Sequence, residues 1–169
     1  MTKKKFPEYT TVANEPITIC DYMNPKVFDF PFFNEGVSIL KDRSFSQKGS
    51  NISDITPLDT NTLLEIKGFI FHTSHCGSTL LAKMLGSSPQ VRVVSETEAI
   101  NGLFLSYLIY QLPEEKVIDH LQKIIQAYCQ PMGKEKYVVF KFTSWNVFCL
   151  LYTSPSPRDQ RGSRMPSSA

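Results

Sequence analysis

The sequence predicts an α/β fold in which a parallel sheet carries helices on both faces. From about residue 68 onward, short apolar runs typical of buried strands alternate with longer segments of helical period. Residues 68–85 show this most clearly, because an apolar run, a turn of small residues and an amphipathic segment follow one another directly. Polar clusters follow three of the expected strands. In a parallel sheet such strand ends meet at one edge, where ligands bind.

The individual elements follow from the hydrophobic period. Strands are inferred from short apolar runs, and helices from apolar residues that recur every three or four positions. These patterns predict strands at 68–73, 91–95 and 137–143, and helices at 78–87, 99–111 and 114–129. The segment 99–111 is apolar almost all round, which predicts burial between elements or contact with another part of the fold.

The first part of the chain has a different character. Residues 1–60 contain five prolines and only short apolar pieces, so we expect an irregular N-terminal extension. A short strand or turn is expected near 17–20 and another near 37–40. Residues 61–148 are expected to form the α/β domain.

The turn that joins the first strand of this domain to its helix is a candidate anion site. Backbone N–H groups at a helix N-terminus favour a bound phosphate or sulfate. Gly77 lets the backbone approach the anion closely, and the hydroxyls of Ser78 and Thr79 add donors.

Two familiar phosphate loops do not fit this turn. A Walker A loop needs a lysine directly after its last glycine, but Ser78 follows Gly77 and the next lysine, Lys83, lies within the expected helix. This argues against ATP or GTP hydrolysis. A cysteine phosphatase would need an arginine six residues beyond Cys76, where the chain has Ala82. Cys76 is therefore interpreted as a small turn residue rather than a nucleophile.

The segment 73–81, with the sequence TSHCGSTLL, resembles the 5′-phosphosulfate-binding loop of the sulfotransferases. It is most similar to bacterial sulfotransferase-like proteins, in which such a loop precedes a second strand and a Ser-Glu-Pro-type motif. Residues 91–101, VRVVSETEAIN, match that second element, and the resemblance covers about 68–148. It implies a P-loop NTPase-like, three-layer fold and sulfuryl transfer from 3′-phosphoadenosine-5′-phosphosulfate (PAPS) to a hydroxyl or amine of a small-molecule acceptor.

The resemblance also implies roles for individual residues. Glu96 would be the general base, with Glu98 as the alternative, and His75 stands where the family has Lys or Arg. Lys141 would reach the phosphosulfate or pair with Glu96, and the other interpretation of Lys141 is a solvated strand end. His72 is interpreted as a core histidine. The expected PAPS-binding residues are Ser74, His75, Cys76, Gly77, Ser78, Thr79 and Lys141, and the expected catalytic residues are Glu96 and His75.

Two other functions remain open at this point. One is a nucleotide- or phosphate-binding P-loop module without transfer activity, because His75 replaces the usual cation. The other is a P-loop kinase, against which the missing lysine argues. No metal is expected in any of the three cases.

Residues 149–169 are expected to be a non-native tail. Cys149 to Asp159 and Ser163 to Ala169 match, in one reading frame, the translation of a transposon-type adapter used for sequencing libraries, with three variable codons between them. The α/β domain would then be incomplete after Phe148. The alternative is an ordinary Ser/Pro-rich disordered tail.

This tail affects the bulk composition. The whole chain has a formal net charge of +2, but the tail holds three arginines and one aspartate, so residues 1–148 have equal numbers of basic and acidic side chains. The charge therefore does not indicate nucleic acid or an acidic membrane surface. Cys20, Cys76 and Cys129 have no disulfide-framework spacing, which, with the lack of a signal-peptide pattern, predicts a cytoplasmic protein.

Overall fold

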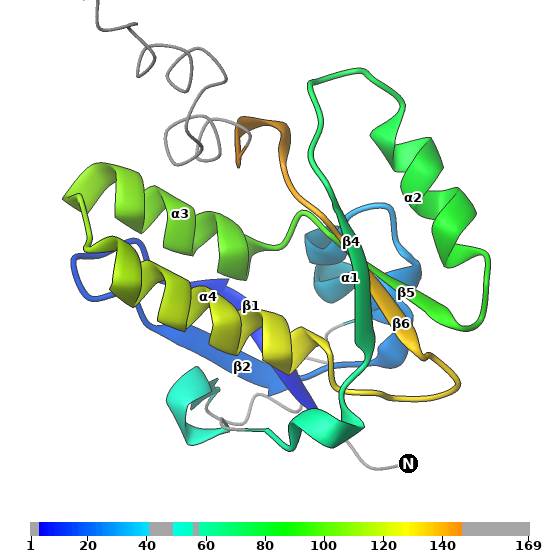
Figure 1. Ribbon diagram of the computed structural model, residues 1–169, viewed down its shortest axis with the longest axis horizontal. Coiled ribbons are helices and arrows are strands. Elements are labelled where there is room, and N and C mark those ends of the chain that lie inside the picture. Colours follow the sequence, from blue (N-terminus) through cyan, green and yellow to red (C-terminus); the bar gives the residue numbers. More distant parts are fainter. Residues whose placement is uncertain (1–3, 41–48, 56–57, 147–169) are drawn as a thin grey trace, which may run out of the picture.

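The computed structural model describes residues 4–40, 49–55 and 58–146 (Figure 1). The strands are β1 (Lys5–Thr10), β2 (Thr18–Tyr22), β3 (Ser50–Asn51), β4 (Glu65–Ile70), β5 (Val91–Ser95) and β6 (Tyr137–Lys141). The α-helices are α1 (Phe33–Leu40), α2 (Ser78–Gly86), α3 (Glu98–Tyr110) and α4 (Glu114–Tyr128). Short 3-10 turns are η1 (Pro25–Asp29), η3 (Ile52–Asp54), η4 (Thr60–Thr62) and η5 (Ser144–Asn146).

The second half of the chain forms a parallel sheet in the order β4-β6-β5. The middle strand, β6, is the last of the three in the sequence and pairs in parallel with both neighbours. Figure 1 shows α2 on one side of this sheet and α3 and α4 on the other. The prediction of a mixed α/β fold with a parallel sheet is confirmed.

The element boundaries agree closely except at β4 and at the end of β6. Strand β5 has the predicted bounds, and no end of α2, α3 or α4 differs from prediction by more than one residue. Strand β6 ends at Lys141 instead of 143, and β4 spans Glu65–Ile70 instead of 68–73. The apolar pattern does not indicate the start of β4, because Glu65 and Lys67 are polar and exposed. Strand β4 ends at Ile70, whose carbonyl accepts a hydrogen bond at 3.0 Å from the N–H of Phe142, the residue after β6.

The N-terminal region is not irregular, contrary to the sequence prediction. β1, β2 and β3 form an antiparallel sheet in that order, and β2 occupies the strand expected near 17–20. The prediction of a strand or turn near 37–40 is wrong, because α1 covers these positions. Phe33, Gly36, Val37 and Leu40 recur at helical spacing and are buried or half-buried. The helical pattern is short and directly follows a proline-rich stretch, which obscures it in the sequence.

The N-terminal sheet shares one hydrophobic core with the α/β part. Phe6 stacks on Tyr128 of α4, with ring centroids 6.5 Å apart. The hydroxyl of Tyr128 donates a hydrogen bond to Pro7 O at 2.6 Å, and the hydroxyl of Thr10 donates to Ala99 O of α3 at 2.7 Å. Helix α3 is therefore buried between elements over its first half, as its apolar composition predicted, while Leu108 and Ile109 in its second half are exposed.

Arg92 of β5 is a buried cation that contacts the end of α4, the loop before β6 and η1. Its Nη1 donates to Tyr128 O and Gln130 O, at 2.9 and 2.7 Å, and its Nη2 donates to Glu135 Oε1 at 2.8 Å. The guanidinium also lies 4.6 Å from the ring centre of Phe28 in η1. Burial is the largest single influence on Glu135 and would raise its pKa, but the hydrogen bond and charge of Arg92, together with backbone hydrogen bonds, outweigh burial and lower that pKa.

We expect Glu135→Gln to lower the free energy of unfolding by about 1–2 kcal/mol at neutral pH, because Arg92 loses its charged partner. Since the pKa of Glu135 is lower in the folded state, its stabilisation is complete above about pH 4.3, the unfolded value, and is lost as the pH falls toward the folded value. The difference between the two proteins should therefore shrink on acidification. Urea denaturation at a series of pH values measures it.

The matched control is Glu65→Gln, which removes an exposed partner of Lys67. This variant should unfold like the wild type at every pH, because exposed ion pairs contribute little. A Glu135→Gln protein whose stability difference from the wild type is independent of pH would contradict the prediction.

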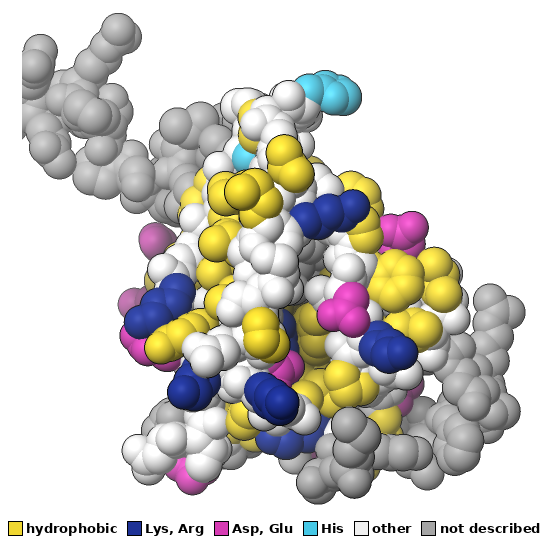
Figure 2. Space-filling view, turned by 90° about the vertical axis from the view of Figure 1, so that its right-hand side faces the viewer, with side chains coloured by type: hydrophobic (Ala, Val, Ile, Leu, Met, Phe, Trp, Pro, Cys, Tyr) yellow, Lys and Arg dark blue, Asp and Glu magenta, His cyan; other side chains and the backbone are white. Residues whose placement is uncertain are grey.

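The two edges of the parallel sheet differ. β5 is covered by η1, whereas no described strand pairs with the outer edge of β4. Phe69 of β4 and Phe71 just after it are 47% and 38% exposed. Figure 2, which faces α2, shows apolar side chains spread over that side of the molecule, and Leu80 and Met84 of α2 are among the exposed residues. The expectation of an incomplete α/β domain stays a prediction.

In the parts of the chain that the structure describes, no helix combines the length and apolar character that crossing a membrane requires. The tail predicted at 149–169 lies outside the described residues.

Candidate functional site

The carboxyl ends of the three parallel strands bring a lysine, a carboxylate and a hydroxyl together. Lys141, the last residue of β6, has a side chain that is 1% exposed and forms an ion pair with Glu96, which follows β5. The same Nζ lies 3.4 Å from the hydroxyl of Thr79 in the first turn of α2. One buried cation therefore joins the element after β4 to the turn after β5. Of the alternatives for Lys141, the structure has the pair with Glu96, and the interpretation as a solvated strand end is wrong because the side chain is buried.

The loop before α2 presents its backbone at the N-terminus of the helix. His75 and Gly77 have positive φ angles of 59° and 83°, so two residues of this short loop lie in the left-handed region. Gly77 is the N-cap of α2 and no side chain caps the helix. The first helical bond runs from Leu81 N to Gly77 O at 3.2 Å. The preceding N–H groups of the helix are the donors that an anion would take.

The side chains of this loop divide into two groups. Ser74, His75 and Cys76 are exposed, while Ser78 and Thr79 are half-buried under the loop. The Ser74 hydroxyl donates to the Ser144 hydroxyl of η5 at 3.4 Å, which places the residues after β6 next to the loop. The structure thus brings together all the predicted loop residues, Lys141 and Glu96.

Glu96 occupies a strained backbone position. Its φ of 51° lies in the left-handed region, which costs a non-glycine residue about 1–3 kcal/mol and is often found at functional sites. Two hydrogen bonds hold it there: its N–H donates to Lys141 O at 2.8 Å, and Asn34 Nδ2 donates to its carbonyl at 3.3 Å. Its carboxylate then faces Lys141 and also His72, whose Nε2 is 3.6 Å from Glu96 Oε1.

Glu98, the alternative base, points elsewhere. Its carboxylate accepts a hydrogen bond from Asn34 Nδ2 of α1 at 2.8 Å, and its own N–H donates to Asn34 Oδ1 at 3.3 Å. It is exposed and has no contact with Lys141 among the described interactions. The geometry favours Glu96 over Glu98 as the carboxylate of this site.

Sequence reasoning missed the contribution of the N-terminal region. Asn34 holds the turn that carries Glu96 and Glu98, and the Phe32 ring centre lies 5.2 Å from Lys141 Nζ. The contact of Phe32 is a cation–π geometry that helps to accommodate the buried ammonium. No local pattern near these residues indicates such a role, because the site lies far away in the sequence.

The described cysteines are all free. Burial raises the pKa of Cys20 to about 12 and that of Cys129 to about 11, so both thiols stay protonated at neutral pH. Cys76 is exposed in the loop. Within the described residues, nowhere do three or more His, Cys, Asp and Glu side chains gather as they would around a metal ion.

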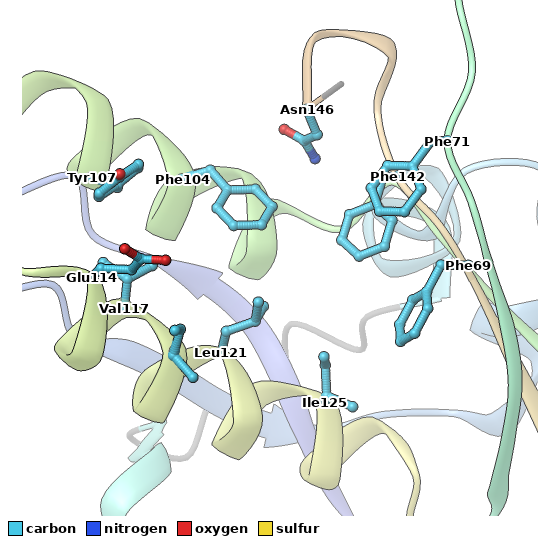
Figure 3. A pocket seen from close by; sticks show the side chains of 11 residues that line it. Phe69, Phe71, Phe104, Tyr107, Glu114, Val117, Leu121, Ile125, Phe142 and Asn146 are labelled. Atoms are coloured by element: carbon cyan, nitrogen blue, oxygen red, sulfur yellow. The ribbon is translucent and has the colours of Figure 1, made fainter. Parts of the chain in front are cut away.

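A separate apolar cavity of about 350 Å³ lies between the sheet and helices α3 and α4 (Figure 3). Because side chains alternate along a strand, Phe142 faces this cavity while the neighbouring Lys141 faces the opposite side of the sheet. The cavity is therefore distinct from the polar site. Its lining includes Phe69, Phe71, Phe104, Leu121 and Phe142, with Asn146 at one end and Glu114 at the other.

No protein-family model matches the chain, and no curated protein or solved structure matches it significantly. The residues of the site and their geometry are therefore the basis on which a function is assigned.

Proposed function

We propose that the chain is a sulfotransferase-like protein that transfers a sulfuryl group from PAPS to a hydroxyl or amine of a small-molecule acceptor. The observation that carries this proposal is the position of Lys141. Its buried ammonium lies between the Thr79 hydroxyl of an uncapped helix N-terminus and the Glu96 carboxylate. An anion held by the loop and a base for the acceptor would thus be neighbours.

The loop offers neutral hydrogen-bond donors to an anion, and the neighbouring Lys141 adds one positive charge. The backbone N–H groups of residues 76–79 and the hydroxyls of Ser78 and Thr79 would bind the 5′-phosphosulfate. Lys141, next to Thr79, would stabilise the negative charge that grows on the leaving phosphate. His75 stands exposed in the loop, where its imidazole could add a donor.

Glu96 would accept the proton that the attacking group of the acceptor substrate loses. As the acceptor oxygen or nitrogen attacks sulfur in line with the leaving phosphate, its proton would pass to the Glu96 carboxylate. The S–O bond to the phosphate breaks, and the bisphosphate product leaves. The strained backbone and the two flanking hydrogen bonds keep this carboxylate at the end of β5.

A binding module without transfer activity is the second candidate. The lack of Lys or Arg at His75 favours it, since the loop itself then has no fixed cation. A P-loop kinase has less support, because Lys83 lies exposed within α2 rather than in the loop. Turnover separates a transferase from a binder, and anion binding by itself does not.

We expect the bisphosphate product of PAPS to bind to the wild type, and Gly77→Val to weaken this binding by at least about tenfold. The positive φ of 83° is unfavourable for a branched residue, and the side chain would stand where the anion approaches the backbone. A Cβ at this position meets no atom within 4 Å, so the variant should still fold. Isothermal titration calorimetry measures the affinity, and circular dichroism checks the fold.

The control for this experiment is Gly86→Ala at the other end of α2, where a Cβ makes only an ordinary contact of 3.5 Å with Val93. It should bind the product like the wild type. Equal affinities of the wild type and the folded Gly77→Val protein would refute the loop as the anion site.

A further inference from the structure

His72 lies at the functional site and not in the core. It follows β4, its side chain is only 10% exposed, and its Nε2 faces the Glu96 carboxylate at 3.6 Å. The other ring nitrogen, Nδ1, is 3.1 Å from Thr73 O. Nε2 is buried and has no hydrogen-bond partner among the residues that the structure describes. A buried imidazole nitrogen without a partner, aimed at a carboxylate, calls for a chemical explanation.

The hydrogen bond to Thr73 decides which nitrogen of His72 carries the proton. A carbonyl oxygen only accepts, so Nδ1 must be the donor. In neutral imidazole the other nitrogen is then a bare lone pair. Nε2 and the Glu96 carboxylate oxygen are therefore two acceptors that face each other, and the space between them is suited to one additional proton.

The charges around this pair determine where such a proton would reside. The groups that face it are Glu96 from the turn after β5, the Lys141 ammonium from β6 and, beyond it, the Thr79 hydroxyl of α2. The ammonium lies against Glu96 Oε1, so a proton on that oxygen would face a positive charge. The imidazole nitrogen is the remaining acceptor within reach.

We propose that His72 is the final acceptor of the proton released during transfer. The proton leaves the attacking hydroxyl or amine for Glu96 and moves from Glu96 Oε1 to His72 Nε2. This step turns the imidazole into an imidazolium and restores the carboxylate beside Lys141. His72 thus acts through Glu96, and its imidazolium gives the proton to solvent before the next turnover. This role rests on the proposed transfer reaction.

The tautomer of His72 can be measured without any turnover. In ¹⁵N-labelled protein, long-range ¹H–¹⁵N correlation spectra of the neutral imidazole should show the proton on Nδ1 and a bare Nε2. His72→Gln identifies the resonances, and His120, whose Nε2 lies 2.7 Å from the Thr18 hydroxyl, gives an internal comparison. A neutral His72 with its proton on Nε2 would overturn the proposal, because no lone pair would then face Glu96.

Turnover tests the role itself. His72→Gln should lower kcat by about 10²-fold, a typical effect of losing a proton-transfer group, while the KM for PAPS and the affinity for its product stay unchanged. Added imidazole should restore part of the rate. His120→Gln, remote from the site, should behave like the wild type.

Failure of the proposed function and failure of the role of His72 give different results. Absence of sulfuryl transfer by the wild type would overturn the proposed function and this role with it. Full turnover by His72→Gln, or a loss that appears equally in product affinity, would overturn the role of His72 and leave the proposed function in place.

Discussion

Replacing Glu96 by glutamine is expected to lower kcat by about 10²- to 10⁴-fold, the range typical of a lost general base, with product binding unchanged. The amide cannot take the acceptor proton, whereas the loop that binds the anion keeps all its donors. The loss should therefore appear in kcat and not in the calorimetric affinity for the bisphosphate product. Steady-state kinetics combined with calorimetry separates the two quantities.

The structure makes this substitution a sharp test. Glutamine has nearly the same shape as glutamate and meets the same backbone strain at φ 51°, but it leaves the buried Lys141 without its charged partner, so circular dichroism must first show that the variant folds like the wild type. Glu98→Gln is the matched control, since its carboxylate binds Asn34 and not Lys141. Undiminished turnover by Glu96→Gln, with a loss in Glu98→Gln, would identify Glu98 as the base.

Gly102→Ala should destabilise the fold by about 3 kcal/mol or more, at or above the upper end of the range for overpacking. A Cβ on this residue of α3 would lie 2.2 Å from Thr10 O. That atom belongs to the backbone of β1, so no side-chain rotation relieves the clash. The N-terminal sheet would have to move away from α3 and lose the hydrogen bond from Thr10 to Ala99. Urea denaturation followed by circular dichroism measures the effect.

The same substitution at Gly86 provides the control. There the added methyl group meets only Val93, at an ordinary 3.5 Å, and alanine in place of a helical glycine typically stabilises by about 0.4–1 kcal/mol. The two Gly→Ala variants should therefore shift stability in opposite directions. A Gly102→Ala protein as stable as the wild type would show that α3 and β1 are not in close contact.

Sequence reasoning succeeded where the signal is local. Strand β5 and helix α4 were predicted closely because a buried strand and an amphipathic helix each have their own hydrophobic period. The strand β4 was predicted but placed three residues too late, because Glu65 and Lys67 at its start are polar and exposed. Helix α1 was missed, because its eight residues are too few to show a clear helical period next to the prolines.

Some residues of the candidate site were predicted from the sequence and others were not. Ser74, Glu96 and Lys141 were predicted because each comes at or just after a strand, and parallel strands end at one edge of a sheet. Asn34 and His72 were not. Asn34 reaches the site only because the N-terminal region packs against it, and His72 was assigned to the core because it directly follows an apolar run.

The sequence by itself determined the alternation of strands and helices, the small-residue turn with Gly77 before α2 and the polar residues at the strand ends. All of these depend on near neighbours in the chain. Only the tertiary structure decided the order β4-β6-β5, the N-terminal sheet on α3 and the contacts of Lys141 with both Thr79 and Glu96. Strand order and side-chain contacts between distant segments depend on how whole elements pack, and no local pattern encodes that packing.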